Sequence, residues 1–108
     1  MKSSSQRRYE ILLPLRFNDG KAVPDDLIVD TLLELEEQFE SISAESAPVQ
    51  DVWRHQGKRY RDDLLRVQVD VHDTRRNRRF FQSYKKTLED RFQQIEIRIT
   101  SHLIEVVE

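Results

Sequence analysis

The sequence predicts a single α+β domain of the ferredoxin-like type, with the order β-α-β-β-α-β and two helices on one face of an antiparallel sheet. Two kinds of pattern carry this prediction. Several stretches alternate apolar and polar residues with a period of two, which is typical of half-buried strands. Two further stretches repeat apolar residues at spacings of three and four, which predicts amphipathic helices. The chain of 108 residues fits one such domain.

The first strand is predicted from an alternation near the N-terminus, which ends at the turn-forming Asn18-Asp19-Gly20. Its inward residues are Tyr9, Ile11, Leu13, Leu15 and Phe17. Pro14 has no N–H donor, so it indicates an edge position or a bulge in this strand. We expect residues 1–7 to form a disordered tail and residues 8–108 to form the domain.

The first helix is predicted from Pro24 to Glu40. Proline suits a first helical turn, and Asp25 and Asp26 favour the positive end of the helix dipole. The apolar stripe consists of Ile28, Leu32, Leu35, Phe39 and Ile42, widened by Leu27 and Thr31. The acids of this segment fall on the opposite face.

A hairpin is predicted in the middle of the chain, after a connection rich in serine and alanine. Val49 to His55 has the pattern of a second strand, and Gly57 marks a turn. Lys58 to Arg61 extend the hairpin until Asp62-Asp63 interrupts it. The third strand then runs from Leu65 to Val71, where apolar and polar residues alternate again.

The second helix and the last strand complete the order. Asp73 or Thr74 can cap the helix. Its core stripe consists of Phe81, Tyr84, Leu88 and Phe92. The fourth strand is predicted from Ile95 to Ile99. The alternation then slips at residues 100–102 and resumes in another phase, so we expect a bulge or an extra short C-terminal strand.

Composition limits the class of protein. The chain has no cysteine, which excludes disulfides and thiolate metal sites. Its first eight residues lack the apolar segment of a signal peptide, and no apolar run approaches the roughly 20 residues that span a bilayer. We therefore expect a cytoplasmic protein that does not enter a membrane.

A net charge of −2 hides a strong asymmetry of charge along the chain. Residues 22–46 contain eight acids and no base, whereas residues 54–91 contain twelve Lys and Arg against six acids. The densest basic segment, Arg75, Arg76, Arg78 and Arg79, falls in the first turns of the second helix. Basic residues there oppose the helix dipole, so an anion such as nucleic-acid phosphate is one candidate ligand. The commoner alternative is that these arginines are solvated or pair with acids of the first helix.

The predicted sheet face away from the helices is charged. It carries Glu10, Arg16, Arg66, Gln68, Asp70, His72, Glu96 and Arg98. RNA-recognition domains of this topology stack bases on aromatic residues of that face, and the third strand here offers none. Asp70 and His72 are residue types that perform acid–base chemistry or bind zinc, but a surface pair is their ordinary role. No metal-ligand spacing occurs, so we expect no catalytic residue, no metal site and no cofactor.

From Trp53 onward the chain resembles a family of short bacterial proteins known only as a domain of unknown function. The shared features are Trp53-Arg54, Gly57, Arg61-Asp62 before the strand from Leu64 to Val71, and Arg91-Phe92-Gln93-Gln94 at the end of the second helix. The resemblance covers residues 53–94. It implies a ferredoxin-like fold, carries over no functional residue and implies no known enzyme class.

Three functions remain open from the sequence. The first is a non-enzymatic, homo-oligomeric interaction module, with a homodimer expected, because the apolar segment Leu103 to Val107 can add to a partner's sheet edge. The second is weak, sequence-independent binding of nucleic acid or another polyanion by the four arginines. The third, and least favoured, is a small enzyme that uses His72 and Asp70. Trp53 either packs in the core or lines an interface or a pocket.

Overall fold

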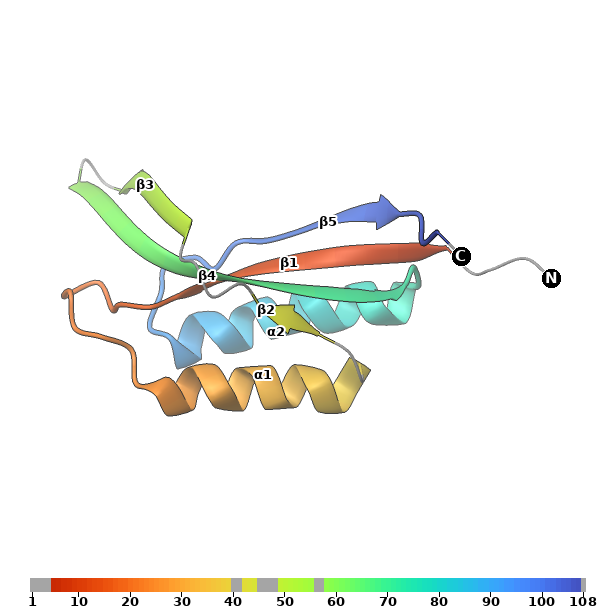
Figure 1. Cartoon of the computed structure of the whole chain (residues 1–108). Helices are drawn as coiled ribbons and strands as arrows, with labels where there is room; N and C mark the ends of the chain where they lie inside the picture. The colour runs from red at the N-terminus through yellow and green to blue at the C-terminus, as the bar shows by residue number, and fades with distance from the viewer. Residues whose placement is uncertain (1–4, 40–41, 45–48, 56–57, 108) are drawn as a thin grey trace.

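The computed structural model describes residues 5–39, 42–44, 49–55 and 58–107, and for residues 49–55 and 58–63 it describes the backbone alone. The elements are β1 (Gln6–Pro14), α1 (Asp25–Phe39), β2 (Ser43–Ala44), β3 (Val49–His55), β4 (Lys58–His72), α2 (Arg75–Arg91) and β5 (Ile99–Ile104). All described strand pairs are antiparallel, in the order β2-β4-β1-β5, with β3 also paired to β4. Both helices lie on one side of this sheet (Figure 1). The predicted ferredoxin-like α+β fold is confirmed.

The hydrophobic core lies between the helices and the central strands β1 and β4, where Ile11 is opposite Val67. It consists of Tyr9, Ile11, Leu13, Val23, Leu35, Val67, Val69, Val71, Phe81, Tyr84, Leu88, Phe92 and Ile97. Ile28 and Leu32 of α1 pack against these residues. The two helical stripes and the inward strand residues therefore share one interior, as their periodicities predict.

The start of the domain differs from the prediction. β1 begins at Gln6, which is paired with both His72 and Ile104, so Gln6 and Arg7 belong to the sheet and not to a tail. Residues 1–4 of the predicted tail lie outside the described residues. β1 ends at Pro14 rather than Phe17, and Leu15 O then accepts from Val23 N instead of continuing the ladder with β4. The turn that follows contains Gly20 at a φ of 87°, a conformation that glycine adopts without strain.

The central hairpin is longer than predicted. β4 runs without a break through Asp62-Asp63, which are opposite Asp51 and Gln50 of β3. Hydrogen bonding to β3 therefore overrides the local preference of two aspartates to end a strand. β3 and the first half of β4 extend as a two-stranded arm beyond the pairing with β1 (Figure 1). Gly57 and the surroundings of the Trp53 side chain lie outside the described part of the structure.

The C-terminal strand lies later in the chain than predicted, so the prediction of a strand from Ile95 to Ile99 is wrong. α2 ends at Arg91, and Gln93 at a φ of 54° reverses the chain. Ile97 then enters the core, where its N–H donates to the Glu89 carboxylate and its carbonyl accepts from Lys85 Nζ. β5 begins at Ile99, one residue after the hydrogen bond from Leu12 N to Arg98 O, and pairs with β1 through residues 100–102, so it is one strand with no bulge at the predicted slip.

Candidate functional site

Two pairs of side chains on the polar face of the sheet are hydrogen-bonded to each other. Arg8 Nε and Nη2 donate to the two carboxylate oxygens of Asp70 at 2.8 and 2.9 Å. The hydrogen bonds from Arg8 outweigh desolvation and hold the pKa of Asp70 below its usual value. Gln68 Nε2 donates to Glu10 Oε1 at 2.9 Å. Because both oxygens of Asp70 are already engaged, this geometry favours a structural role for Asp70 over an acid–base role.

The other residues predicted for this face do not form one site. His72 is exposed at the end of β4, and its carbonyl accepts from Asn77 Nδ2. Arg66 and Arg98 lie on the predicted face, half-buried and exposed respectively. Two residues are elsewhere: Glu96 lies 3.6 Å from Lys85 Nζ on the helical side, and Arg16 lies beyond β1, with Nη1 donating to Gly20 O. Among the described residues, no group of His, Asp and Glu could hold a metal ion.

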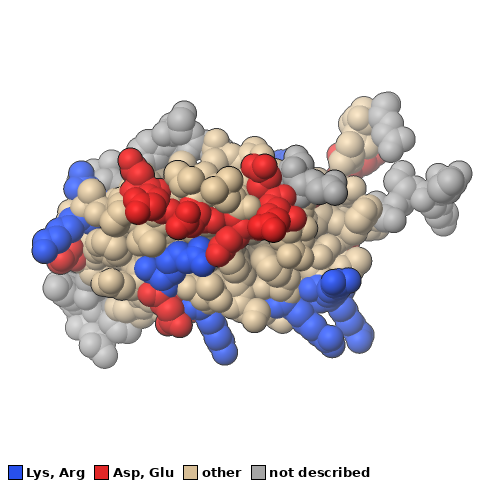
Figure 2. Space-filling view, turned by 90° about the horizontal axis from the view of Figure 1, so that it is seen from below, with Lys and Arg blue, Asp and Glu red and all other residues tan. Residues whose placement is uncertain are grey.

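The arginine cluster (Arg75, Arg76, Arg78 and Arg79) opens α2. Thr74 caps the helix, with Oγ1 accepting from Asn77 N at 3.1 Å. All four arginine side chains are exposed, and none forms an ion pair or a side-chain hydrogen bond within the described part of the chain. Figure 2 shows a stripe of acidic side chains across the helical face. Lys and Arg side chains lie next to this stripe and along the lower edge of the view. The predicted pairing of this cluster with the acids of α1 is absent from the described residues.

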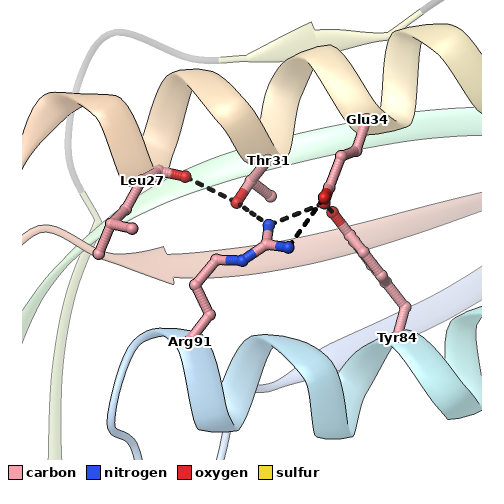
Figure 3. Close-up of polar contacts among 5 residues, drawn as sticks. All are labelled: Leu27, Thr31, Glu34, Tyr84 and Arg91. Carbon is pink, nitrogen blue, oxygen red and sulfur yellow. Dashed lines mark hydrogen bonds and ion pairs between the residues drawn. The ribbon is translucent and has the colours of Figure 1, made fainter.

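One pair of charges does join the helices. Arg91 Nη1 and Nη2 donate to Glu34 Oε1 and Oε2 at 2.7 and 2.9 Å (Figure 3). Arg91 Nη1 also donates to Oγ1 of Thr31 at 2.9 Å, and that hydroxyl donates to Leu27 O. Tyr84 Oη completes the cluster by donating to Glu34 Oε1 at 2.7 Å.

The interhelical cluster shifts the pKa values of some of its members, but it has the properties of a structural link between the helices. The hydrogen bonds from Arg91 lower the pKa of Glu34, whereas burial and the neighbouring Glu34 carboxylate raise the pKa of Tyr84. Each of the polar groups already has a partner, so no nucleophile or free base is presented. One signal for this cluster was visible beforehand, because Thr31 is a polar residue inside an apolar stripe.

The outer edge of β5 is a second surface of interest. Leu12 N donates to Arg98 O, so these residues form a hydrogen-bonded pair of the antiparallel ladder. By alternation, the peptide groups of residues 100, 102 and 104 point to β1, and those of residues 99, 101 and 103 point outward. No described strand pairs with this outer edge. Exposed apolar side chains lie along or just after it: Leu103 (59%), Val106 (58%) and Val107 (90%).

Comparisons with known proteins show the fold alone. No protein-family model and no curated protein matches the chain, so the resemblance to a bacterial domain of unknown function stays a prediction. A phage SAM lyase in complex with S-methyl-5'-thioadenosine is similar in structure, with a TM-score of 0.65 and 10% identity over 98% of this chain and 94% of that chain. CutA from Synechococcus elongatus is also similar, with a TM-score of 0.58 and 10% identity over 96% and 80%. None of the described helices could cross a membrane.

Proposed function

We propose that the protein is a homo-oligomeric interaction module, a homodimer, that associates through the free edge of β5. The observation that carries this proposal is an edge strand with outward peptide groups and an exposed apolar side chain, Leu103. Edge strands are usually protected by lysine, proline, a bulge or a covering segment. Residues 99–104 contain no lysine, arginine, acid or proline, and β5 is regular. Such an edge favours addition of another strand.

The proposed association implies one register. Two antiparallel edge strands related by a two-fold axis perpendicular to the sheet keep their helices on the same side, so paired residues must share a face. The outward peptide groups then match best when Ser101 is opposite Ser101 of the second copy and Ile99 is opposite Leu103. Two bonds for each hydrogen-bonded pair give roughly six across the new edge.

Light scattering after size-exclusion chromatography tests the proposal. We expect a dimer at micromolar concentration and a monomer for Leu103→Arg, because a charge replaces the apolar contact at the edge. Leu33→Arg is the matched control: Leu33 is similarly exposed (55%, against 59% for Leu103) but lies on α1. A monomeric wild type, or equal dissociation by both variants, would contradict the proposal.

Hydrogen exchange tests the register independently of mass. The amides of Thr100 and His102 bond to β1 and should be protected at every protein concentration. Those of Ser101 and Leu103 point outward and should gain protection only as the protein associates. Concentration-independent exchange of Ser101 and Leu103 in a dimer would place the interface elsewhere.

A second candidate function is polyanion binding by the arginine cluster. This candidate is supported by four exposed arginines in two helical turns. None of them has an acidic partner among the described residues. Fluorescence anisotropy with short single-stranded and duplex DNA at low salt tests it. Arg75→Ala/Arg79→Ala should weaken binding at least tenfold, whereas Arg16→Ala/Arg98→Ala, at two exposed arginines outside the cluster, should change it little. Equal effects of the two double variants would reject the site.

A further inference from the structure

We propose that a cleft between α2 and the β1–β5 edge binds a small organic anion: a carboxylate or phosphate ester attached to an apolar group. The cleft has a volume of about 330 Å³, near the lower end of small-molecule sites. Nine residues line it: three are cationic (Arg7, Arg78 and Lys85), none is acidic, and the others include Gln82, Ile99 and Ser101.

The floor of the cleft is apolar and fixed. The rings of Tyr9 and Phe81 stack with centroids 3.9 Å apart, and both residues are core residues. Ile99 of β5 is half-buried beside them. A floor built from core side chains needs no ordering when a ligand binds, which lowers the entropic cost of binding.

Arg7 is a charged residue at a position of β1 that faces the helices, where apolar residues are usual. It is opposite Val71 and Leu103 and therefore lies on the helix-facing side of the sheet, where its side chain is only 16% exposed. Arg7 Nε donates to Asp73 at 2.9 Å and Nη1 donates to Ser101 Oγ at 3.1 Å. These bonds fix the plane of the guanidinium, and neither of them uses Nη2. A guanidinium held in this way is suited to a second, charge-assisted contact.

Arg78 supplies charge that the protein does not neutralise within the described residues. It is exposed and has no side-chain partner there. Lys85, by contrast, is engaged with Glu89, Glu96 and the Ile97 carbonyl, and Asp73 offsets Arg7. The surplus positive charge therefore comes from Arg78, above an apolar floor. This combination selects a ligand with one anionic group and one apolar group.

The cleft shares residues with both functions proposed above, because Ile99 and Ser101 belong to β5 and Arg78 belongs to the arginine cluster, but its ligand chemistry differs from theirs. Among the four residues of the arginine cluster, only Arg78 lines it. Binding there requires no pairing of β5 with a second copy, and a polyanion without an apolar group has nothing to place on the floor.

Phenyl phosphate is the probe, and a titration followed by amide NMR shifts at low salt is the measurement. We expect saturable shifts centred on Phe81, Gln82, Ile99 and Ser101, with a dissociation constant of about 1 mM. Phenol lacks the anionic group and inorganic phosphate lacks the apolar group, so each should bind at least tenfold more weakly than phenyl phosphate. Shifts that do not saturate, or that centre on residues 75 and 76, would overturn the proposal.

Two matched variants locate the charge contact. Arg78→Gln should weaken phenyl phosphate about tenfold, the loss expected for one charge-assisted hydrogen bond, and should leave the mass by light scattering unchanged. Arg79→Gln removes a neighbouring exposed arginine outside the cleft and should leave the affinity within twofold. Equal weakening by both variants would mean that the ligand senses only the general charge of the helix, and would overturn the site.

Discussion

Replacing Arg91 with methionine tests how the two helices are held together. Methionine keeps most of the aliphatic length but removes three hydrogen bonds: two to Glu34 and one to the buried Thr31. Hydrogen bonds to charged groups contribute about 1.5–3 kcal/mol. The Glu34 side chain is 46% exposed, however, and water can replace Arg91 there, so the pair is discounted to about 1 kcal/mol. The lost bond to Thr31 adds about 1 kcal/mol, because that hydroxyl is buried.

We therefore expect Arg91→Met to lower the free energy of unfolding by about 2 kcal/mol at pH 7. Urea denaturation followed by circular dichroism measures this difference, and Arg79→Met, at an exposed arginine without a described partner, is the control. Combining Arg91→Met with Glu34→Gln in a double-mutant cycle isolates the energy of the pair. A loss no larger than that of the control would refute the structural account of the cluster.

The pH dependence of the same variant has a defined sign. The folded-state pKa of Glu34 is lowered, so its contribution is complete above the unfolded value of about 4.3 and is lost as the pH falls through the folded value. Arg91→Met removes the main cause of that lowering. The difference in stability between wild type and Arg91→Met should therefore shrink between pH 7 and pH 3. A difference that is constant over this range would mean that Glu34 is not ionised in the cluster.

Three further predictions concern stability. Thr74→Ala removes the hydroxyl that accepts from Asn77 N, and should cost about 1 kcal/mol in urea denaturation; Thr74→Ser should restore most of it. Leu88→Ala opens a cavity at a fully buried position and should cost about 2–5 kcal/mol, measured in the same way. The folded-state pKa of Tyr84 is raised. Its contribution to the free energy of unfolding is therefore fully present below the unfolded pKa of about 10 and falls as the pH rises above that value. Tyr84→Phe should remove that alkaline loss of stability.

The sequence predicts the parts of the fold in which local pattern and burial agree. The alternation around Ile11 and Val67 defines two adjacent central strands, and the stripe through Leu88 defines the buried face of α2. The last strand is different, because Ile95, Ile97 and Ile99 alternate as a strand does. The Ile97 peptide is held instead by side chains of α2, and periodicity does not distinguish these two ways of burying an isoleucine.

The surfaces are less predictable than the core because they depend on distant pairs. Glu34 and Arg91 are 57 residues apart, and no spacing rule joins them. Arg7 carried a usable signal: counting back by two from Tyr9 places an arginine on the inward face of β1. The prediction of a tail through residue 7 hid this signal, and with it one wall of the cleft.

Salt dependence separates the edge of β5 from every charge-based mode of association. Acidic and basic side chains lie on one face of the molecule (Figure 2), and opposite charges of this kind attract one copy to the next. Such contacts weaken as salt screens them. Backbone hydrogen bonds and apolar contacts along β5 do not depend on screening in this way.

We therefore expect the dimer dissociation constant to change less than about twofold between about 50 and 250 mM NaCl. Duplex DNA that contacts all four arginines should instead lose roughly 300-fold in affinity, since each neutralised phosphate contributes a slope of about −0.9 in the logarithm of the binding constant against the logarithm of salt. Sedimentation equilibrium and anisotropy measure the two quantities in the same buffers. A dimer that dissociates in parallel with the DNA complex would assign the interface to the acidic and basic helices, and β5 would then be an unpaired edge.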